Sequence, residues 1–359
     1  MLKTSGLVKI EQEAAKALRR LLEQVPIIGH LDVEQVRRRG TGHGADLVAR
    51  LEASGRRHTL VCEVKSSGQP RHVRPALLQL RDHIAREMSG AVPVFIAPYL
   101  SPETRALCDE YEVGFVDLEG NARLAFDGVF IDRQVASKPA AERRELRSLF
   151  KPKSAQILRL MLRQPSRAWR VVGLAEAAGV SLGHVSNVRS GLLDREWAQV
   201  SDEGLLLSDP DALLDAWREA YEPPAGRRHD FYTTLHGEAF DKIVRELHPA
   251  PDAGLTALAS FSAGQWLAPY GRIGTQYFYA DETGLARLCV ALKLSAAVKG
   301  ENVAVTVLEE PGVFRDTVEP APGVICTSPV QTYLDLTVAG ERGREAADHL
   351  RQERLQWRK

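Results

Sequence analysis

The sequence predicts an α/β protein in three parts: a mixed sheet with helices, a helical segment that ends in a hairpin, and a second α/β part. Apolar strands alternate with amphipathic helices at both ends of the chain, as in α/β domains. Polar residues 138–153 and the stretch Glu222-Pro223-Pro224-Ala225-Gly226 mark two linkers between them. A chain of 359 residues suggests two or three domains. We therefore expect domains at 1–137, 151–222 and 228–359.

The composition is that of a globular, core-forming protein, with 44% hydrophobic and 26% charged residues. The net charge is zero, but residues 151–200 hold 8 Lys or Arg against 3 Asp or Glu, which makes this segment the expected place for phosphate contacts. The 4 cysteines are isolated, so we expect reduced thiols and neither disulfides nor a zinc site. The sequence shows no signal peptide and no apolar run long enough to span a bilayer, so we expect a cytoplasmic protein without a membrane partner.

Residues 9–24 are expected to form the first helix, because Ile10, Ala14, Leu18 and Leu22 fall on one stripe. Residues 33–39 are expected to form a strand that carries three arginines. Residues 40–44 would then form a basic loop that leads to Asp46. Such arginines either hold a phosphate backbone or are simply solvated.

Residues 44–65 read as two short strands joined by a turn at residues 53–57. Asp46 opens the first apolar run. In the second run, side chains alternate between the two faces of the strand, so Glu63 and Lys65 share a face with Val61. A carboxylate and an ammonium thus project from an otherwise apolar strand. Each would be costly to bury alone, so we expect each to have a partner, a metal or solvent.

This stretch resembles the catalytic motif of the PD-(D/E)XK nuclease superfamily, which has the restriction-endonuclease-like fold. Asp46 matches the first acid and Glu63-Val64-Lys65 the E-x-K element, whereas Ala45 stands where the family name has proline. The resemblance implies a Mg²⁺ (or Mn²⁺) site with Asp46 and Glu63 as ligands and Lys65 beside the attacking water; hard oxygen ligands suit this ion. The alternatives are a surface hairpin with an incidental ion pair and a nuclease-like domain that has lost catalysis.

The next elements continue the α/β pattern. A helix at 75–87 would place Leu77, Leu80 and Ile84 inward, with Gln79 near the edge of this stripe. The nuclease resemblance makes Gln79 a candidate site residue and Glu13, from the first helix, a weaker one; the alternative for both is an exposed polar side chain. Strands at 92–97 and 114–118, a helix at 102–111 and short strands around 127–128 complete a mixed, partly parallel sheet.

Residues 154–208 are expected to form three helices and a two-stranded hairpin. The third helix begins after Ser181 and turns Val185, Val188 and Leu192 inward. Its outward side chains are polar: His184, Ser186, Asn187, Arg189 and Ser190. A helix that reads bases in the major groove presents such donors and acceptors.

This order of elements resembles a winged helix-turn-helix domain. The resemblance implies DNA binding through the third helix, or alternatively a protein contact. Asp202 and Glu203 make the hairpin tip acidic, which argues against its entering a groove.

The last part resembles the AbiEi antitoxin family of type IV toxin-antitoxin systems. The resemblance rests on residues 268–270, 309–314, 328–336 and 340–347 and is expected to extend from Ser154 to the end. It implies a transcriptional repressor whose C-terminal α/β domain neutralises a nucleotidyltransferase-like toxin. The alternative is that these residues serve only the fold, as buried side chains of a helix and as glycines in turns.

Two functions therefore compete. One is a Mg²⁺-dependent DNA endonuclease that the winged helix places on DNA. The other is an AbiEi-type antitoxin and repressor whose nuclease-like domain is not catalytic. Both bind DNA, and the oligomeric state stays open, with a homodimer among the alternatives.

Overall fold

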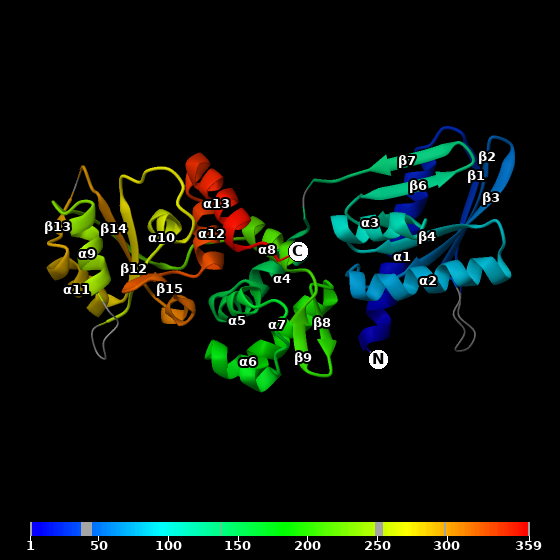
Figure 1. Ribbon diagram of the computed structural model, residues 1–359. Coiled ribbons are helices and arrows are strands. Elements are labelled where there is room, and N and C mark those ends of the chain that lie inside the picture. Colours follow the sequence, from blue (N-terminus) through cyan, green and yellow to red (C-terminus); the bar gives the residue numbers. More distant parts are fainter. Residues whose placement is uncertain (1, 37–44, 137, 248–253, 298, 358–359) are drawn as a thin grey trace. The chain divides into compact units, whose positions relative to one another are not determined.

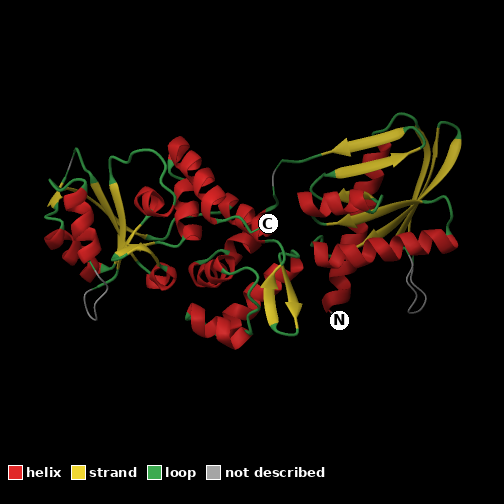
Figure 2. Ribbon diagram, viewed as in Figure 1, coloured by secondary structure: helices red, strands yellow, loops and turns green. Residues whose placement is uncertain are grey.

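The computed structural model describes residues 2–36, 45–136, 138–247, 254–297 and 299–357. The predicted arginine cluster and the loop 40–44 lie outside the described residues. The chain divides into two compact units, Met1–Glu142 with Leu193–Glu196, and Arg143–Leu192 with Trp197–Lys359. The regions expected as the second and third domains lie mainly in the second unit. Each unit holds a sheet with helices, so the predicted α/β class is confirmed (Figure 2).

The sheet of the first unit has the strand order β1-β2-β3-β4-β5-β6-β7. Strands β3, β4 and β5 run parallel, and all other neighbours are antiparallel, so the predicted mixed sheet is present. The strands span β1 (Ile28–Gln35), β2 (Leu47–Ala53), β3 (Arg56–Val64), β4 (Val92–Ala97), β5 (Gly114–Asp117), β6 (Ala122–Phe126) and β7 (Val129–Arg133).

Helix α1 (Leu2–Glu23) covers one face of this sheet. Its predicted stripe is confirmed: Ala14, Leu18 and Leu22 are fully buried against the Leu60, Cys62 and Val64 side of β3. Because β-strand side chains alternate, the Val61 side of β3 belongs to a second core, formed with α2 (Pro70–Glu87) and α3 (Pro102–Glu110). Glu63 and Lys65 fall on this second side.

Helix α2 (Pro70–Glu87) begins five residues before the predicted start at Pro75. Pro70 takes the first helical position, where its missing N–H costs nothing. Pro70 and Val73 are buried, so the extra turn adds apolar contact to the core. Pro75 lies inside the helix on its exposed side. Two prolines near the start left the boundary ambiguous, and the burial of the first turn decides it.

In the second unit, a helical segment precedes a two-stranded hairpin (Figure 1). The three helices and two hairpin strands expected over residues 154–208 are present as α5 (Pro152–Arg163), α6 (Val171–Ala178), α7 (Leu182–Asp194), β8 (Ala198–Ser201) and β9 (Gly204–Leu207). The stretch 138–153, expected as a linker, is mostly helical, because α4 (Ala140–Leu149, mostly in this unit) lies within it. Helix α8 (Pro210–Glu219) follows the hairpin.

One strand-like contact in this segment was not predicted. The backbone of Trp169 exchanges both hydrogen bonds with Leu205, at 2.8 and 2.9 Å, and so adds a bridge to the hairpin. Gly204 makes this approach feasible, because its φ is +143° and a Cβ there would lie 2.5 Å from the Trp169 carbonyl oxygen. The hairpin is therefore anchored to the segment between α5 and α6.

The C-terminal part forms a second mixed sheet with the order β13-β10-β14-β12-β11-β16-β15. Strands and helices alternate along this part of the chain, as the sequence predicts for an α/β domain. The bounds are β10 (Gly226–Tyr232), α9 (Glu238–Glu246), β11 (Thr256–Leu258), α10 (Ser260–Leu267), β12 (Gln276–Ala280), α11 (Glu282–Ala291), β13 (Ser295–Ala296), β14 (Val303–Leu308), η1 (Pro311–Asp316), β15 (Val318–Ala321), β16 (Val324–Cys326), α12 (Pro329–Thr337) and α13 (Gly340–Arg354).

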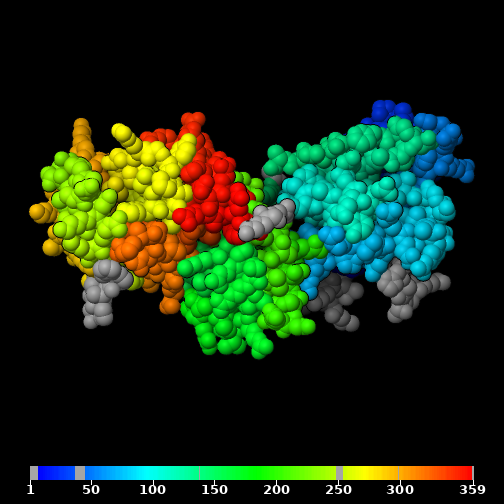
Figure 3. Space-filling view, in the orientation of Figure 1, coloured from blue at the N-terminus to red at the C-terminus, as the bar shows by residue number. Residues whose placement is uncertain are grey.

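Helix α12 is buried along its whole length and packs on α5, α10 and α13. In the space-filling view, the red residues of the last helices border the green helical segment (Figure 3). This junction is polar at its centre. Arg159 of α5 donates to the Gln331 side chain of α12, at 3.0 Å, and Asp335, one turn later, accepts from Gln331 at 2.9 Å. The helical segment and the C-terminal sheet thus share a buried hydrogen-bond network.

None of the described helices combines the length and the apolar character that crossing a bilayer requires.

Candidate active site and candidate DNA interface

The structure brings three of the four predicted catalytic residues together at the end of β3. Asp46 precedes β2, and its backbone N–H and its carboxylate bond to Cys62 and Val64, the two residues that flank Glu63 in the chain. The side-chain ammonium of Lys65 donates to the Glu63 carboxylate, which confirms that these two side chains share a face. The carboxylates of Asp46 and Glu63 and the ammonium of Lys65 therefore belong to the same end of β3.

Backbone hydrogen bonds hold Asp46 in this position. Its N–H donates to the carbonyl oxygen of Cys62 at 2.9 Å, and its Oδ2 accepts from the N–H of Val64 at 2.8 Å. Only 5% of Asp46 and 9% of Glu63 is exposed, whereas the Lys65 side chain is 34% exposed. The two carboxylates are thus buried, whereas the ammonium is partly exposed to solvent, so solvent reaches the site at Lys65.

The negative charge of Asp46 affects the pKa of Cys62 on the neighbouring strand. Burial raises the pKa of the Cys62 thiol, and Asp46 raises it further. Cys62 points to the α1 side of the sheet, within the core, and therefore stays a neutral thiol. It takes no part in the chemistry of the carboxylates.

The donor set suits a hard divalent cation. Mg²⁺ prefers oxygen ligands and is commonly held by one or two carboxylates while it keeps several waters. Asp46 and Glu63 supply such oxygens from two rigid strands. Within the described residues, no cluster of three or more His, Cys, Asp and Glu side chains has the geometry for a metal ion. A cation at this site would thus have these two carboxylates as its protein ligands, with water or phosphate oxygens completing its shell.

The two polar helix residues do not join this cluster. Gln79 lies on the exposed face of α2, in its third turn, between the exposed Leu78 and the buried Leu80. Glu13 is exposed on α1, as its alternative interpretation held. The predicted inward residues Leu77, Leu80 and Ile84 are buried, and Gln79 beside them is exposed, as its alternative interpretation held.

Gln69, at the start of α2, was not considered from the sequence. It is half-buried at the N-cap position of α2, where its side chain makes no capping hydrogen bond, and its amide donates to Glu142 at 3.2 Å. Asp117 and Asn121, at the end of β5, also escaped notice. Four N–H groups saturate the Asp117 carboxylate, which makes this pair a structural turn.

The predicted recognition helix corresponds to α7, and its faces divide as expected. Val185, Val188 and Leu192 are buried. His184, Ser186, Asn187 and Ser190 are exposed, and Arg189 is half-buried. Ser181 caps the first turn, because its hydroxyl accepts from the His184 N–H at 3.3 Å and bonds the His184 ring at 2.8 Å. Hydrogen-bonding side chains therefore cover one side of this helix.

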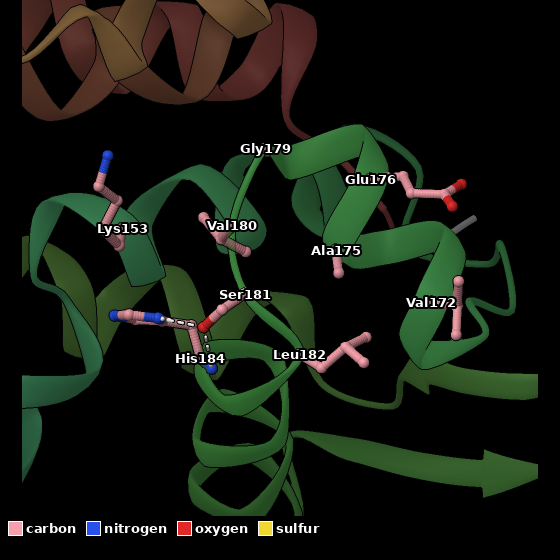
Figure 4. Close-up of a pocket in the computed structure, with 9 residues that line it drawn as sticks. All are labelled: Lys153, Val172, Ala175, Glu176, Gly179, Val180, Ser181, Leu182 and His184. Atoms are coloured by element: carbon pink, nitrogen blue, oxygen red, sulfur yellow. Dashed lines mark hydrogen bonds between the residues drawn. The ribbon is translucent and has the colours of Figure 1, made fainter.

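An open depression of about 640 Å³ adjoins the start of α7 (Figure 4). Lys153 and His184 lie on one side of it and Val172 and Glu176 on the other. Its floor includes the turn at Gly179, which has the left-handed φ of +64° typical of a residue that ends a helix. Val172 and Leu182 are more than half exposed. This surface offers a cation, hydrogen-bonding groups and apolar groups, the three kinds of contact made with DNA grooves.

No curated protein and no solved structure matches the chain. One family model does match, over residues 206–356, which begin within β9 and include the whole C-terminal sheet. The helices α5 to α7 and the carboxylate cluster lie outside this match. The family is described as "Transcriptional regulator, AbiEi antitoxin, Type IV TA system", so residues 206–356 are similar to this family of antitoxins.

Proposed function

We propose that the protein is an AbiEi-type antitoxin and transcriptional repressor, which binds DNA through α7 and a nucleotidyltransferase-like toxin through its C-terminal part. The observation that carries this proposal is the family match over residues 206–356. The polar face of α7 supports it, because a repressor needs a surface that reads DNA. The proposal places the two activities on different elements of one compact unit.

Direct base contact would fall to Asn187 and Arg189. Asparagine pairs with adenine through two hydrogen bonds, and arginine does the same with guanine or holds a phosphate. The acidic turn at Asp202 and Glu203 is exposed, so phosphate would repel the hairpin tip. The proposed interface is therefore the exposed face of α7 with its preceding turn, and not the hairpin tip.

The DNA proposal is tested with Arg189→Ala. Fluorescence anisotropy is measured on a duplex from the region upstream of the protein's own gene and on a random duplex, at several salt concentrations. Loss of a bidentate base contact costs about 1–3 kcal/mol on the specific duplex, and loss of a phosphate contact lowers the salt slope by about one on both. Arg344→Ala, which removes an exposed charge from α13, is the matched control. Unchanged affinity of Arg189→Ala on every duplex would exclude α7 as the interface.

The toxin proposal is tested on the whole chain. Deletion of residues 228–359 would remove α12 and leave the buried Arg159 without its partner Gln331, so a truncated protein would report misfolding rather than a lost toxin contact. The full-length protein is co-expressed with the nucleotidyltransferase-like protein encoded beside it. We expect relief of growth arrest. Arrest that persists with equal expression, or the absence of such a neighbouring gene, would contradict the antitoxin proposal.

The cluster of Asp46, Glu63 and Lys65 favours a second candidate function, a Mg²⁺-dependent DNA nuclease. Asp46 and Glu63 would hold the ion, and Lys65 would hold or move a proton at its ammonium. When bound, the ion would stabilise charge on a phosphate and lower the pKa of its water. Nothing in the residue types at this site prevents catalysis.

Calorimetry and a cleavage assay distinguish the two functions. Mn²⁺ is titrated into wild type, Asp46→Asn and Asp82→Asn; the last removes an exposed carboxylate of α2 as a control. We expect binding that only Asp46→Asn abolishes. Plasmid and linear DNA are then incubated with Mg²⁺ and wild type or Glu63→Gln. Cleavage that Glu63→Gln abolishes would establish the nuclease, whereas metal binding without cleavage would favour the repressor alone. Mn²⁺ binding that is equal in all three proteins would refute the metal site.

A further inference from the structure

A cavity of about 250 Å³ lies in the second unit, and no residue of α7 lines it. Its lining residues come from α4, α5, α8, η1, α12 and the segments that flank them. All the lining residues belong to one compact unit. The volume is just below the roughly 300 Å³ at which ligand pockets begin, so the cavity could take only a small molecule.

One wall of the cavity is aromatic. The rings of Phe150 and Trp217 are stacked, with centroids 5.5 Å apart and planes 3° from parallel. Phe150 is half-buried, and Trp217 is 2% exposed. Ala155 and Val313, both buried, add further apolar surface. A flat apolar body would find matching contacts here.

The charged group of this cavity is Arg159, which is 3% exposed. Its guanidinium donates to the side-chain oxygen of Gln331 and to the carbonyl oxygen of Gly312, both at 3.0 Å. Its Nε has no hydrogen-bond partner. Both acceptors are neutral. No ion pair to Arg159 occurs among the residues that the structure describes.

Ionisable groups beyond hydrogen-bond distance offset the cost of burying the Arg159 charge only in part. Burial lowers the pKa of Arg159, and the carboxylates of Asp316 and Asp335 and the hydroxyls of Tyr221 and Tyr279 offset this lowering without reversing it. A buried cation with an unused N–H donor is costly, and a carboxylate is its best complement because it accepts parallel hydrogen bonds from a guanidinium. The guanidinium therefore favours an anion in the cavity.

Charged groups at the mouth of the cavity balance one another. Arg147 and Lys151 are exposed there, and so are Glu222, Glu309 and Glu310. Arg147 lies 3.8 Å from Glu222. Because these charges are solvated and of both signs, they provide no strong preference for a charged ligand. The preference would come from Arg159.

We propose that this cavity is a binding site for a small organic anion, a carboxylate attached to a flat apolar ring. The carboxylate would accept hydrogen bonds from Arg159, and the ring would lie against Phe150 and Trp217. The occupant would touch α5 and α8 as well as η1 and α12. It would therefore stabilise the junction between the helical segment and the C-terminal sheet, whether or not the protein is an antitoxin.

The test compares acids with their amides. Benzoate and phenylacetate are titrated into the full-length protein by calorimetry and saturation-transfer NMR, with benzamide and phenylacetamide as neutral analogues of the same shape. We expect an acid to bind at least about tenfold more tightly than its amide, as loss of a charged hydrogen bond implies. Equal binding of acid and amide, or binding of none of the four, would overturn the proposal.

Variants then identify the site. Arg159→Gln is expected to remove the preference for the acid, and Arg163→Gln, one turn later on α5 and paired with Asp316 at 3.1 Å, is expected to keep it. Val313→Phe, which fills the cavity without changing its charge, is expected to weaken the binding of the acid and of the amide equally. Acid binding that survives both Arg159→Gln and Val313→Phe would refute the assignment. If Arg159→Gln loses its circular dichroism signal, Val313→Phe and the acid–amide comparison in wild type decide.

Discussion

Replacing Asp335 by asparagine should change how the stability of the second unit depends on pH. Asp335 is buried in α12, and its Oδ1 accepts from Tyr221, Tyr279 and Gln331. Burial raises its pKa from 3.8 to about 6, although these hydrogen bonds oppose the rise. The folded protein therefore favours the neutral carboxyl group.

The sign and size of the effect follow from linkage. Because the folded pKa lies above the unfolded one, the stabilising contribution of Asp335 is complete below pH 3.8 and is lost as the pH rises to about 6. At 1.36 kcal/mol per pKa unit, the loss in wild type is about 3 kcal/mol. Asparagine stays neutral at every pH and keeps an oxygen for the three donors. Asp335→Asn should thus equal wild type at about pH 3 and exceed it by up to about 3 kcal/mol at about pH 8.

Urea denaturation followed by circular dichroism across this pH range measures the difference. Asp348→Asn, which alters an exposed carboxylate of α13, is the control and should follow wild type. The pKa itself can be read from the ¹³C shift of the Asp335 carboxyl carbon. The reasoning fails if Asp335→Asn is less stable than wild type at about pH 8, or if the two proteins keep the same slope between about pH 4 and pH 6.

Two further predictions concern single residues. Cys289 should react first with iodoacetamide under native conditions, because it is half-exposed, whereas burial raises the pKa of Cys108 and of Cys326 to about 12. Mass spectrometry of the labelled peptides measures the order of reaction, and equal labelling of these three cysteines would contradict the prediction. Gly204→Ala should destabilise the hairpin by at least about 1–3 kcal/mol, because alanine avoids a φ of +143° and its Cβ would meet the Trp169 carbonyl oxygen. Gly128→Ala also has a positive φ but open space around it, so it measures the backbone cost alone; equal losses in the two variants would show that the Trp169 contact does not matter.

The candidate sites differ in how far the sequence could predict them. Glu63 and Lys65 are two residues apart on one strand, so their common face followed from alternation alone. The helical spacing of Val185, Val188 and Leu192 likewise determined which side of α7 is exposed. The same spacing identified Leu77, Leu80 and Ile84 as the buried side of α2, whereas the exposure of Gln79 at the edge of this stripe depended on how the helix packs.

The sequence by itself determined the class of each part, the positions of most helices of the first 220 residues, and the residue types at the end of β3. These properties depend on periodicity and on neighbours a few residues apart, which a single chain displays directly. Only the tertiary structure decided that the Asp46 carboxylate accepts a hydrogen bond from Val64, beside Glu63, and that Arg159 and Gln331 meet although 172 residues separate them. Such contacts depend on sheet register and on the packing of whole helices, for which no local pattern exists.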